Sequence, residues 1–268
     1  MSGLLLRLAG PLQSWGERSA FASVRDTAPF PTRSALIGMF AAAEGIGRDG
    51  GGLDRYEDLR FTVRVDRPGI RLVDYHTVGG GFPKNRTAAT SGGSNKGAAV
   101  ITRRHYLSDA VFVVAVTAAD DATVERLADA LGRPHWAPYL GRRSCVPDEP
   151  FLLRCHVDDP EEELRTRVPL SRTAPRAKDS DGQGEGAATI AVEFLREQPR
   201  PIDGSPEPVP VDVIDVNDMP VTFAQHGRSH TGRRLHRTRE PVLRSLAGPS
   251  ETLTQRLIDY AAHIEESA

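Results

Sequence analysis

Two adjacent arginines follow a glycine in the stretch Tyr139-Leu140-Gly141-Arg142-Arg143-Ser144-Cys145. Neighbouring side chains in a loop point in different directions. The two guanidinium groups can therefore clamp a bent phosphate backbone, or divide between a phosphate and a base. The alternative is a pair of surface arginines held in salt bridges. The stretch is a candidate for binding nucleic acid.

The stretch Gly10-Pro11-Leu12-Gln13-Ser14-Trp15-Gly16 directly follows an apolar run that reads as a strand. Gln13, Ser14 and Trp15 offer polar and stacking contacts to nucleotides. A base stacked on an exposed aromatic ring contributes about 1–3 kcal/mol. The alternative, which we favour for the tryptophan alone, is a tight turn whose Trp15 covers the core.

The segment Thr32-Arg33-Ser34 is expected at the start of a helix. Backbone N–H groups and the helix dipole attract a phosphate at such a position. An ordinary helix cap explains the same residues equally well.

The segment Val78–Ala98 holds six glycines around Lys84, Arg86 and Lys96 and has almost no apolar content. Such a composition cannot bury itself, so we expect an exposed insertion. It either wraps a single strand of nucleic acid or is a solvated loop. A further basic cluster, either an electrostatic patch or a solvated face, comprises Arg228, Arg233, Arg234, Arg237, Arg239 and Arg244.

Catalytic patterns are scarce in this sequence. It has no phosphate-binding G-x-x-x-x-G-K-[ST] loop. His226 and His230 are four residues apart, but the glycines beside them argue against the helix that a zinc pair would need. We therefore predict no metal and no cofactor. The remaining candidate is His76, which with Tyr75 and Lys84 nearby could act as general base or acid on a ribose 2′-hydroxyl in metal-independent RNA cleavage.

Charge is unevenly divided along the 268 residues. Residues 1–145 carry 19 Lys and Arg against 14 Asp and Glu, a net of +5, whereas residues 146–268 carry 15 against 22, a net of −7. This asymmetry predicts a local basic surface on a chain that is not basic as a whole. The two cysteines fit neither a disulfide framework nor a metal site, and no apolar run is long enough to span a bilayer. We expect a soluble protein of the cytoplasm, away from membranes.

Hydrophobic periodicity predicts strands interrupted by two helices. The expected strands cover residues 4–8, 61–65, 70–76, 101–107, 111–116 and 151–157. One helix begins near Pro31, and a second is capped by Asp120 or Asp121. This order is that of an α+β, ferredoxin-like (RRM-like) core with a thumb-like hairpin insertion at about 78–99. Right-handed crossovers would place both helices on one face and leave the opposite face free for RNA or a partner.

The last hundred residues are harder to interpret. We expect a core over residues 1–165 and an irregular, β-containing C-terminal extension over 166–268. Within the extension, a polar, glycine-rich loop is expected at about 171–186 and a terminal helix at about 250–265. Strands are expected at 189–195 and 211–216.

Taken together, four separated stretches carry a resemblance: Leu6–Gly16, Phe30–Ser34, Asp74–Val78 and Tyr139–Cys145. In this order they resemble the "Cas-five" family of the RAMP superfamily, in particular its type I-E members, the CasD subunits of the CRISPR complex Cascade. Four matches in one order are more specific than any single motif, and they span about residues 1–157.

The resemblance implies a non-catalytic subunit, without a cofactor, that binds and caps the 5′ handle of CRISPR RNA (crRNA) for antiviral defence. Its implied partners are crRNA, CasC backbone subunits, the large subunit CasA, the subunits CasB and CasE and, indirectly, target DNA. The thumb, here Val78–Ala98, would kink the RNA and contact CasC. The implied RNA-binding residues are Gln13, Trp15, Arg33, Lys84, Arg86, Arg103, Tyr139, Arg142 and Arg143.

The same resemblance leaves one alternative function. In type I-E systems CasE cuts the RNA, but a relative in type I-C systems processes repeat RNA itself. A metal-independent endoribonuclease that uses His76 is therefore the alternative. The resemblance is weak after Ser171, so it assigns no role to the C-terminal extension.

Overall fold

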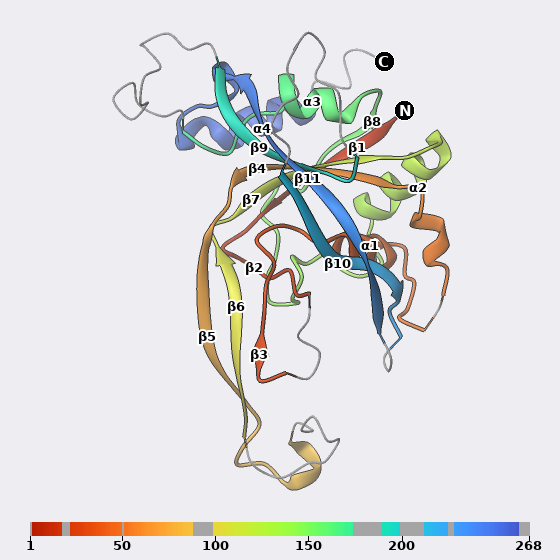
Figure 1. The fold of residues 1–268 in the computed structure, drawn as a ribbon, viewed down its shortest axis with the longest axis vertical. Helices are drawn as coiled ribbons and strands as arrows, with labels where there is room; N and C mark the ends of the chain where they lie inside the picture. Colours follow the sequence, from red (N-terminus) through yellow and green to blue (C-terminus); the bar gives the residue numbers. More distant parts are fainter. Residues whose placement is uncertain are drawn as a thin grey trace.

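The computed structural model describes residues 2–17, 22–49, 51–87, 99–173, 189–198, 212–224 and 228–262. Strands predominate over helices (Figure 1). In chain order the elements are β1 (Gly3–Ala9), β2 (Leu12–Gln13), β3 (Val24–Arg25), α1 (Arg33–Ala43), η1 (Leu53–Tyr56), β4 (Arg60–Arg67), β5 (Ile70–Val78), η2 (Lys84–Arg86), β6 (Val100–Ser108), β7 (Val111–Thr117), α2 (Asp121–Gly132), β8 (Leu152–Val157), α3 (Pro160–Thr166), β9 (Thr189–Arg196), β10 (Asp212–Thr222), β11 (Ser229–Leu243), η4 (Arg244–Leu246) and α4 (Ser250–Ala262).

The central sheet is antiparallel and has the strand order β10-β11-β9-β4-β7-β1-β8. The expected strands at 4–8, 61–65, 111–116 and 151–157 are β1, β4, β7 and β8. Strands β1 and β7 are almost wholly buried, as their apolar sequences require. The fold is therefore mixed α and β, built on one curved antiparallel sheet.

Both predicted helices pack on the same face of this sheet. Phe40 of α1 and Leu127 of α2 lie in one buried cluster with Leu6 and Val114 of the sheet. Helix α2 begins at the expected cap, where the Asp120 carboxylate accepts the Thr123 N–H at 2.8 Å. The apolar stripes predicted from the sequence thus mark the buried sides of both helices.

The expectation that the opposite sheet face is free was wrong. A second buried cluster covers it, in which Leu5 and Val113 of the sheet pack against Leu164 of α3 and Leu257 of α4. Figure 1 shows α3 and α4 on one side of the sheet and α1 and α2 on the other. The reason is that β1 and β7 are apolar on both faces, so each face needs a cover.

The buried Arg64 of β4 holds α3 and the segment after it against the far face of the sheet. It is 0 % exposed and forms an ion pair with Asp66, with Nε 2.7 Å from Oδ1. Its two terminal nitrogens donate to the carbonyl oxygens of Leu164, Val168 and Pro169 at 2.5–2.9 Å. The chain after α3 is therefore tied to the sheet by charge-assisted hydrogen bonds.

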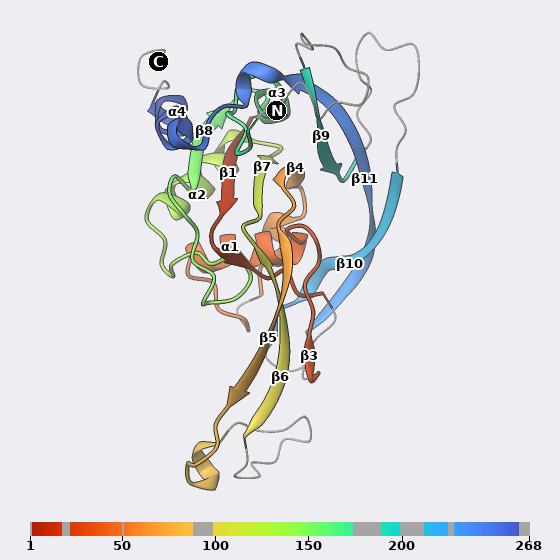
Figure 2. The same cartoon turned by 90° about the vertical axis from the view of Figure 1, so that its left-hand side faces the viewer.

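The strand expected at 70–76 is not the neighbour of the strand at 61–65. Instead β5 pairs along its whole length with β6, in a smaller sheet that also holds β2 and β3. Strand β7 lies beside β4 in the main sheet instead. After the turn at Gly69 the chain forms the β5–β6 hairpin, which extends away from the main sheet. In both views the hairpin projects well beyond the body and carries η2 near its tip (Figures 1 and 2).

The C-terminal strands continue the main sheet across the expected boundary at residue 165. Strand β9 pairs with β4, and the long strand β11 lies between β9 and β10. The division into a core and an extension stays a prediction. Most of the loop expected at 171–186 lies outside the described residues. The expected terminal helix is α4, which the structure describes to Ala262.

Candidate nucleic-acid interface

The loop that carries the two arginines lies directly on the turn after β1. The Ser14 N–H donates to the Leu140 carbonyl oxygen at 3.0 Å. Gly141 has φ +83°, and a Cβ built there would lie 1.7 Å from the Ser14 carbonyl oxygen. Only glycine permits this approach. The first and last stretches of the resemblance therefore meet in space.

Gln13 and Trp15 support this loop from inside the protein. Both are 0 % exposed. Gln13 Nε2 donates to the carbonyl oxygens of Leu8 (2.9 Å) and Ala110 (2.8 Å), while its Oε1 accepts the Trp15 indole N–H at 3.2 Å. All their hydrogen bonds are internal, so neither can touch RNA in this conformation. The alternative in which Trp15 covers the core is the arrangement in the structure.

Arg142 turns its guanidinium towards the smaller sheet. Its Cζ lies 4.5 Å from the centre of the Tyr106 ring, a cation–π contact. Its Nη2 donates to the Arg25 carbonyl oxygen at 3.3 Å. Its Nη1 is buried and has no hydrogen-bond partner in the described part of the chain. Arg142 is therefore fixed in position, and its Nη1 can donate to a ligand only after the atoms that bury it move.

The strand register places two further arginines beside it. Strand β3 runs parallel to β6, so that Arg25 is paired with Arg104. Burial first, and then the charges of Arg104 and Arg142, lower the pKa of Arg25. Like charges on paired positions of a sheet are destabilising. Arg25, Arg104 and Arg142, which we call the arginine row, therefore favour a bound anion.

The remaining predicted residues of this surface divide into near and distant ones. Arg103 is exposed on β6, next to Arg104, and its backbone N–H donates to the Ser23 carbonyl oxygen at 2.8 Å. Arg143 is exposed and Tyr139 half-buried, on the same loop as Arg142. Four predicted residues thus belong to one region, together with Arg25 and Arg104, which the sequence interpretation missed.

Arg33 is not part of this surface, which corrects the prediction. It is 2 % exposed and pairs with Glu197, with Nη1 2.8 Å from Oε1. Its guanidinium also donates to three carbonyl oxygens of the 56–59 segment and lies 5.0 Å from the Phe61 ring centre. The backbone N–H at this helix start is taken by Asp218 Oδ2 at 2.7 Å, so no phosphate can bind there.

Lys84 and Arg86 are exposed, but they lie far from the arginine row. They belong to η2, near the tip of the projecting hairpin (Figure 2). Residues 88–98, which include Lys96, lie outside the described residues. A contact of Lys84 or Arg86 with RNA stays a prediction.

His76 lies on β5 of the same small sheet. Its Nδ1 is 3.1 Å from Asp74 Oδ2, and both side chains are about two-fifths exposed. Asp74 is paired in register with Arg104 on β6. A carboxylate that orients an accessible imidazole is what a general base requires, so the alternative function retains a structural basis.

The predicted cluster at 228–244 is partly neutralised by ion pairs. Arg233 pairs with Asp218 and Glu197, with nitrogen–oxygen distances of 2.5 and 2.9 Å. Arg237 pairs with Asp212, and Arg234 lies 3.8 Å from Asp215. Three of the six arginines, Arg233, Arg234 and Arg237, therefore belong to a salt-bridged sheet surface.

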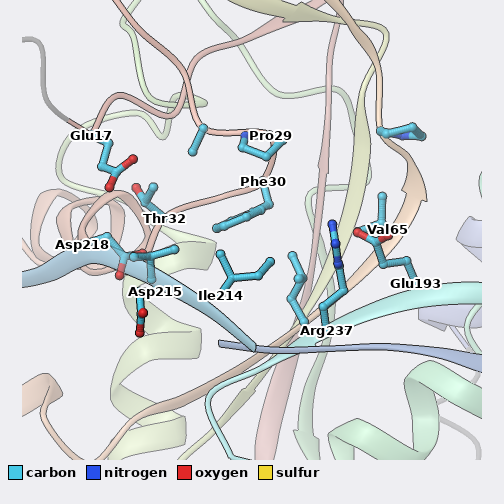
Figure 3. Close-up of a pocket in the computed structure, with 14 residues that line it drawn as sticks. Glu17, Pro29, Phe30, Thr32, Val65, Glu193, Ile214, Asp215, Asp218 and Arg237 are labelled. Carbon is cyan, nitrogen blue, oxygen red and sulfur yellow. The ribbon is translucent and has the colours of Figure 1, made fainter. Parts of the chain in front are cut away.

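A cavity of about 440 Å³ opens between the segment after β3 and strands β9–β11 (Figure 3). Its floor is apolar and includes Phe30 and Ile214. Carboxylates predominate around it, namely Glu17, Glu193, Asp215 and Asp218. With Arg237 as its one lining cation among the described residues against four carboxylates, this cavity does not favour phosphate, and we do not include it in the nucleic-acid surface.

Over the described ranges, no group of three or more His, Cys, Asp or Glu side chains is placed to hold a metal ion. In the same part of the chain no helix combines the length and apolar character needed to cross a membrane.

Comparisons with known proteins agree with the geometry. The family described as "CRISPR-associated protein (Cas_Cas5)" matches residues 3–236. The chain is 39 % identical over 184 residues to the CRISPR system Cascade subunit CasD of Escherichia coli (strain K12), which covers 63 % of this chain and 78 % of CasD.

Two solved structures are similar along nearly the whole chain. A chain of a CRISPR RNA-guided surveillance complex is 46 % identical with a TM-score of 0.79, over 97 % of this chain and 99 % of that one. A crystal structure of a Cas protein is 27 % identical with a TM-score of 0.54, over 91 % and 97 %. This chain therefore belongs to the Cas_Cas5 family of CRISPR-associated proteins.

Proposed function

We propose that this protein is the CasD-type subunit of a type I-E Cascade complex, where it binds and caps the 5′ handle of the crRNA without cleaving it. The observation that supports this most strongly is the arginine row. The fold brings Arg25, Arg104 and Arg142 together, and burial, followed by the charges of the other two, lowers the pKa of Arg25. A cluster of like charges favours a bound anion, such as a phosphodiester backbone.

The position of the row suits a single strand with bases turned outwards. Phosphate contacts fix the register of the strand, and Arg103, Tyr139 and Arg143 are near enough for base contacts. RNA sequence is mostly recognised in single-stranded segments, such as a handle. Gln13 and Trp15 act as positioning residues, because they hold the turn on which the arginine loop lies.

The rest of the fold supports the same assignment. Strands β4, β7, β1 and β8, connected through α1 and α2, have the order of a ferredoxin-like core. The β5–β6 hairpin is the thumb. Large apolar side chains on it are exposed, which is typical of a surface that a partner covers, and we assign that partner as a CasC subunit. They are Ile70, Leu72, Val73, Tyr75, Phe82 and Ile101.

The test is a fluorescence-anisotropy titration of the full chain with RNA that carries the 5′ handle of its own CRISPR repeat. Arg142→Ala combined with Arg143→Ala should weaken binding and lower the salt slope by about 0.7, since each phosphate contact to a single strand contributes about 0.7 and Arg142 is the phosphate contact of the two. The matched control removes Arg234 and Arg239, two exposed arginines of β11, and should bind like the wild type. Equal affinity and slope in both variants would rule out the site.

The alternative, a repeat-processing ribonuclease, is favoured by the pair of Asp74 and His76 alone. Incubation of the purified protein with repeat RNA in EDTA separates the two functions. We expect intact RNA. Cleavage that disappears in His76→Ala would replace our assignment with the catalytic one.

A further inference from the structure

A second exposed basic and aromatic surface lies where α1 ends. The loop after α2 crosses the C-terminus of α1: the His135 N–H donates to the Ala43 carbonyl oxygen at 2.8 Å and the Trp136 N–H to that of Ala42 at 3.3 Å. Gly45 leaves room for it, since a Cβ there would lie 3.0 Å from His135 Cγ. These bonds satisfy terminal helix carbonyls and fix the loop.

Trp136 remains accessible on this fixed loop. Its side chain is 47 % exposed, whereas Trp15, the other tryptophan of the chain, is 0 % exposed. The edge contact with the His135 ring, 4.6 Å between centroids at 84°, orients the indole. A large aromatic ring held by its backbone and open to solvent is a platform for a nucleobase.

Two arginines accompany this platform. Arg48 follows α1 and is exposed, and Arg228 precedes β11 and is exposed. The guanidinium of Arg228 lies 6.0 Å from the Phe223 ring centre, and Phe223 in turn approaches Gly38 of α1, where a Cβ would lie 3.8 Å from Phe223 Cζ. The end of β10 is thereby placed against α1, with the Arg228 guanidinium near the Phe223 ring.

Neither of these arginines forms an ion pair with a carboxylate of the described residues. Partial burial, and then the charge of Arg48, lower the pKa of Arg228, while Tyr139 opposes this shift. The charges of Arg48 and Tyr139 thus act on Arg228. Two guanidinium groups that destabilise each other are stabilised by an anion between them.

We propose that Arg48, Trp136 and Arg228 form a second nucleotide-binding site, in which Arg48 and Arg228 hold one backbone phosphate and a base stacks on Trp136. The occupant is the same RNA strand that binds the arginine row. Tyr139 and Arg142 belong to one loop and are three residues apart, so their Cα atoms are separated by no more than about 11 Å. A strand that passes Arg142 reaches Tyr139 and then the second site.

This inference rests on the proposed function, and tryptophan fluorescence separates the two. The full chain is titrated with the handle RNA, binding being read by anisotropy and stacking by quenching of tryptophan emission. We expect quenching, because Trp136 is the accessible tryptophan and Trp15 is enclosed. Trp136→Phe should keep most of the affinity and abolish the quenching, whereas Trp136→Ala should lower the affinity about 5- to 150-fold.

A charge variant tests the phosphate contact. Arg48→Ala with Arg228→Ala should reduce both affinity and quenching, while the control Arg234→Ala with Arg239→Ala should change neither. Wild-type protein that binds no RNA would refute the proposed function itself. RNA binding that needs Arg142 and Arg143, but is unquenched and indifferent to Arg48 and Arg228, would overturn the second site alone. Unchanged RNA binding with lost assembly of the other Cascade subunits would make this surface a protein contact and equally overturn it.

Discussion

The arginine side chains of this protein occur in two different environments, although all carry the same charge. Arg33 and Arg64 are buried, and each is paired with a carboxylate and several carbonyl oxygens. Arg25, Arg104 and Arg142 instead gather around one another at a strand register that disfavours them. Buried arginines with saturated hydrogen bonds hold the fold, whereas a cluster of like-charged arginines is suited to binding an anion.

Because like charges repel one another within the arginine row, we expect the loss of one of them to stabilise the RNA-free protein and to weaken RNA binding. Arg25→Gln should raise the stability of the RNA-free protein by up to about 1 kcal/mol at low salt, because it removes a like-charge pair. The gain should shrink as salt screens the remaining charges. The same variant should bind handle RNA more weakly. Urea denaturation and RNA titration of one preparation measure both effects.

Arg60→Gln is the matched control for Arg25→Gln, since Arg60 is an exposed arginine of β4. It should change stability by less than about 0.5 kcal/mol. If Arg25→Gln lowers stability and leaves the RNA affinity intact, Arg25 is a structural residue like Arg33.

The loop that carries Arg142 is a structural element in its own right. It is held by backbone hydrogen bonds, Leu140 N–H to the Cys145 carbonyl oxygen at 2.7 Å and Cys145 N–H to that of Arg142 at 2.8 Å. Burial raises the pKa of the Cys145 thiol, so the thiol stays protonated inside the loop. The position of the two arginines is thus set by backbone contacts rather than by their own side chains.

The close approach of Gly141 to Ser14 predicts a large effect from one methyl group. Gly141→Ala combines a positive φ, worth about 1–3 kcal/mol, with a collision against the Ser14 carbonyl. It should lower the melting temperature and weaken RNA binding, because Arg142 moves with the loop. Calorimetry measures the melting temperature, and fluorescence anisotropy measures the RNA affinity.

Gly132→Ala at the end of α2 is the control, because no atom lies within 4 Å of its added Cβ. A helical Gly→Ala change should leave RNA binding unaltered and slightly raise stability. A Gly141→Ala protein as stable and as active as this control would show that the loop adapts freely.

Sequence periodicity predicted the positions of strands and helices well, but it predicted less well which strands pair with one another. Strands β1, β4, β7 and β8 and the cap of α2 follow from apolar runs and one aspartate, which are local signals. That β5 leaves the main sheet to pair with β6 is a long-range choice which no residue of 70–76 reveals. Likewise, Arg25 belongs to the arginine row only because it is paired in register with Arg104, about eighty residues further along the chain.

The burial of Gln13, Trp15 and Arg33 shows the same limit at the site. Residue type alone cannot distinguish a polar side chain that faces a ligand from one that satisfies the core. Only the arginine loop had a direct signal, in its glycine and adjacent charges. Arg228 was marked only as part of a basic cluster and Arg48 had no signal, because their relation depends on how the end of β10 lies against α1.

At the scale of the whole molecule, one buried ion pair ties the segment after α3 to the main sheet. Arg64 of β4 and Asp66 are 0 % and 2 % exposed, and they hold the segment after α3 against the sheet. The Ser171 N–H also donates to Asp66 Oδ2 at 2.7 Å. The cover on the far face therefore depends on this pair.

Removal of one partner should be costly. Asp66→Ala leaves the Arg64 guanidinium buried without a counter-charge, which typically destabilises by about 3–5 kcal/mol. Glu162→Ala breaks an exposed ion pair with Arg165 on α3 and should cost less than about 1 kcal/mol. Guanidinium denaturation of the two variants compares them. Equal losses would mean that the cover contributes little to stability.

The arrangement of the whole molecule separates its surfaces by task. The far face of the sheet is closed, the cavity beside β10 is acidic, and the hairpin presents apolar side chains. Clusters of arginines lie beside the small sheet and near the end of α1. We therefore expect RNA to follow this one side and protein partners to occupy the others.

The central claim is that the arginine row grips an RNA backbone, and a structure of this chain bound to guide RNA in the assembled complex tests it most directly. The account predicts a phosphate oxygen within hydrogen-bond distance of the Arg142 guanidinium, with Nη1, which is buried in the RNA-free protein, uncovered to reach it. Arg25 and Arg104 should lie on the same or the next phosphate. Nucleic acid bound elsewhere, with Arg142 in an ion pair to a carboxylate, would contradict it.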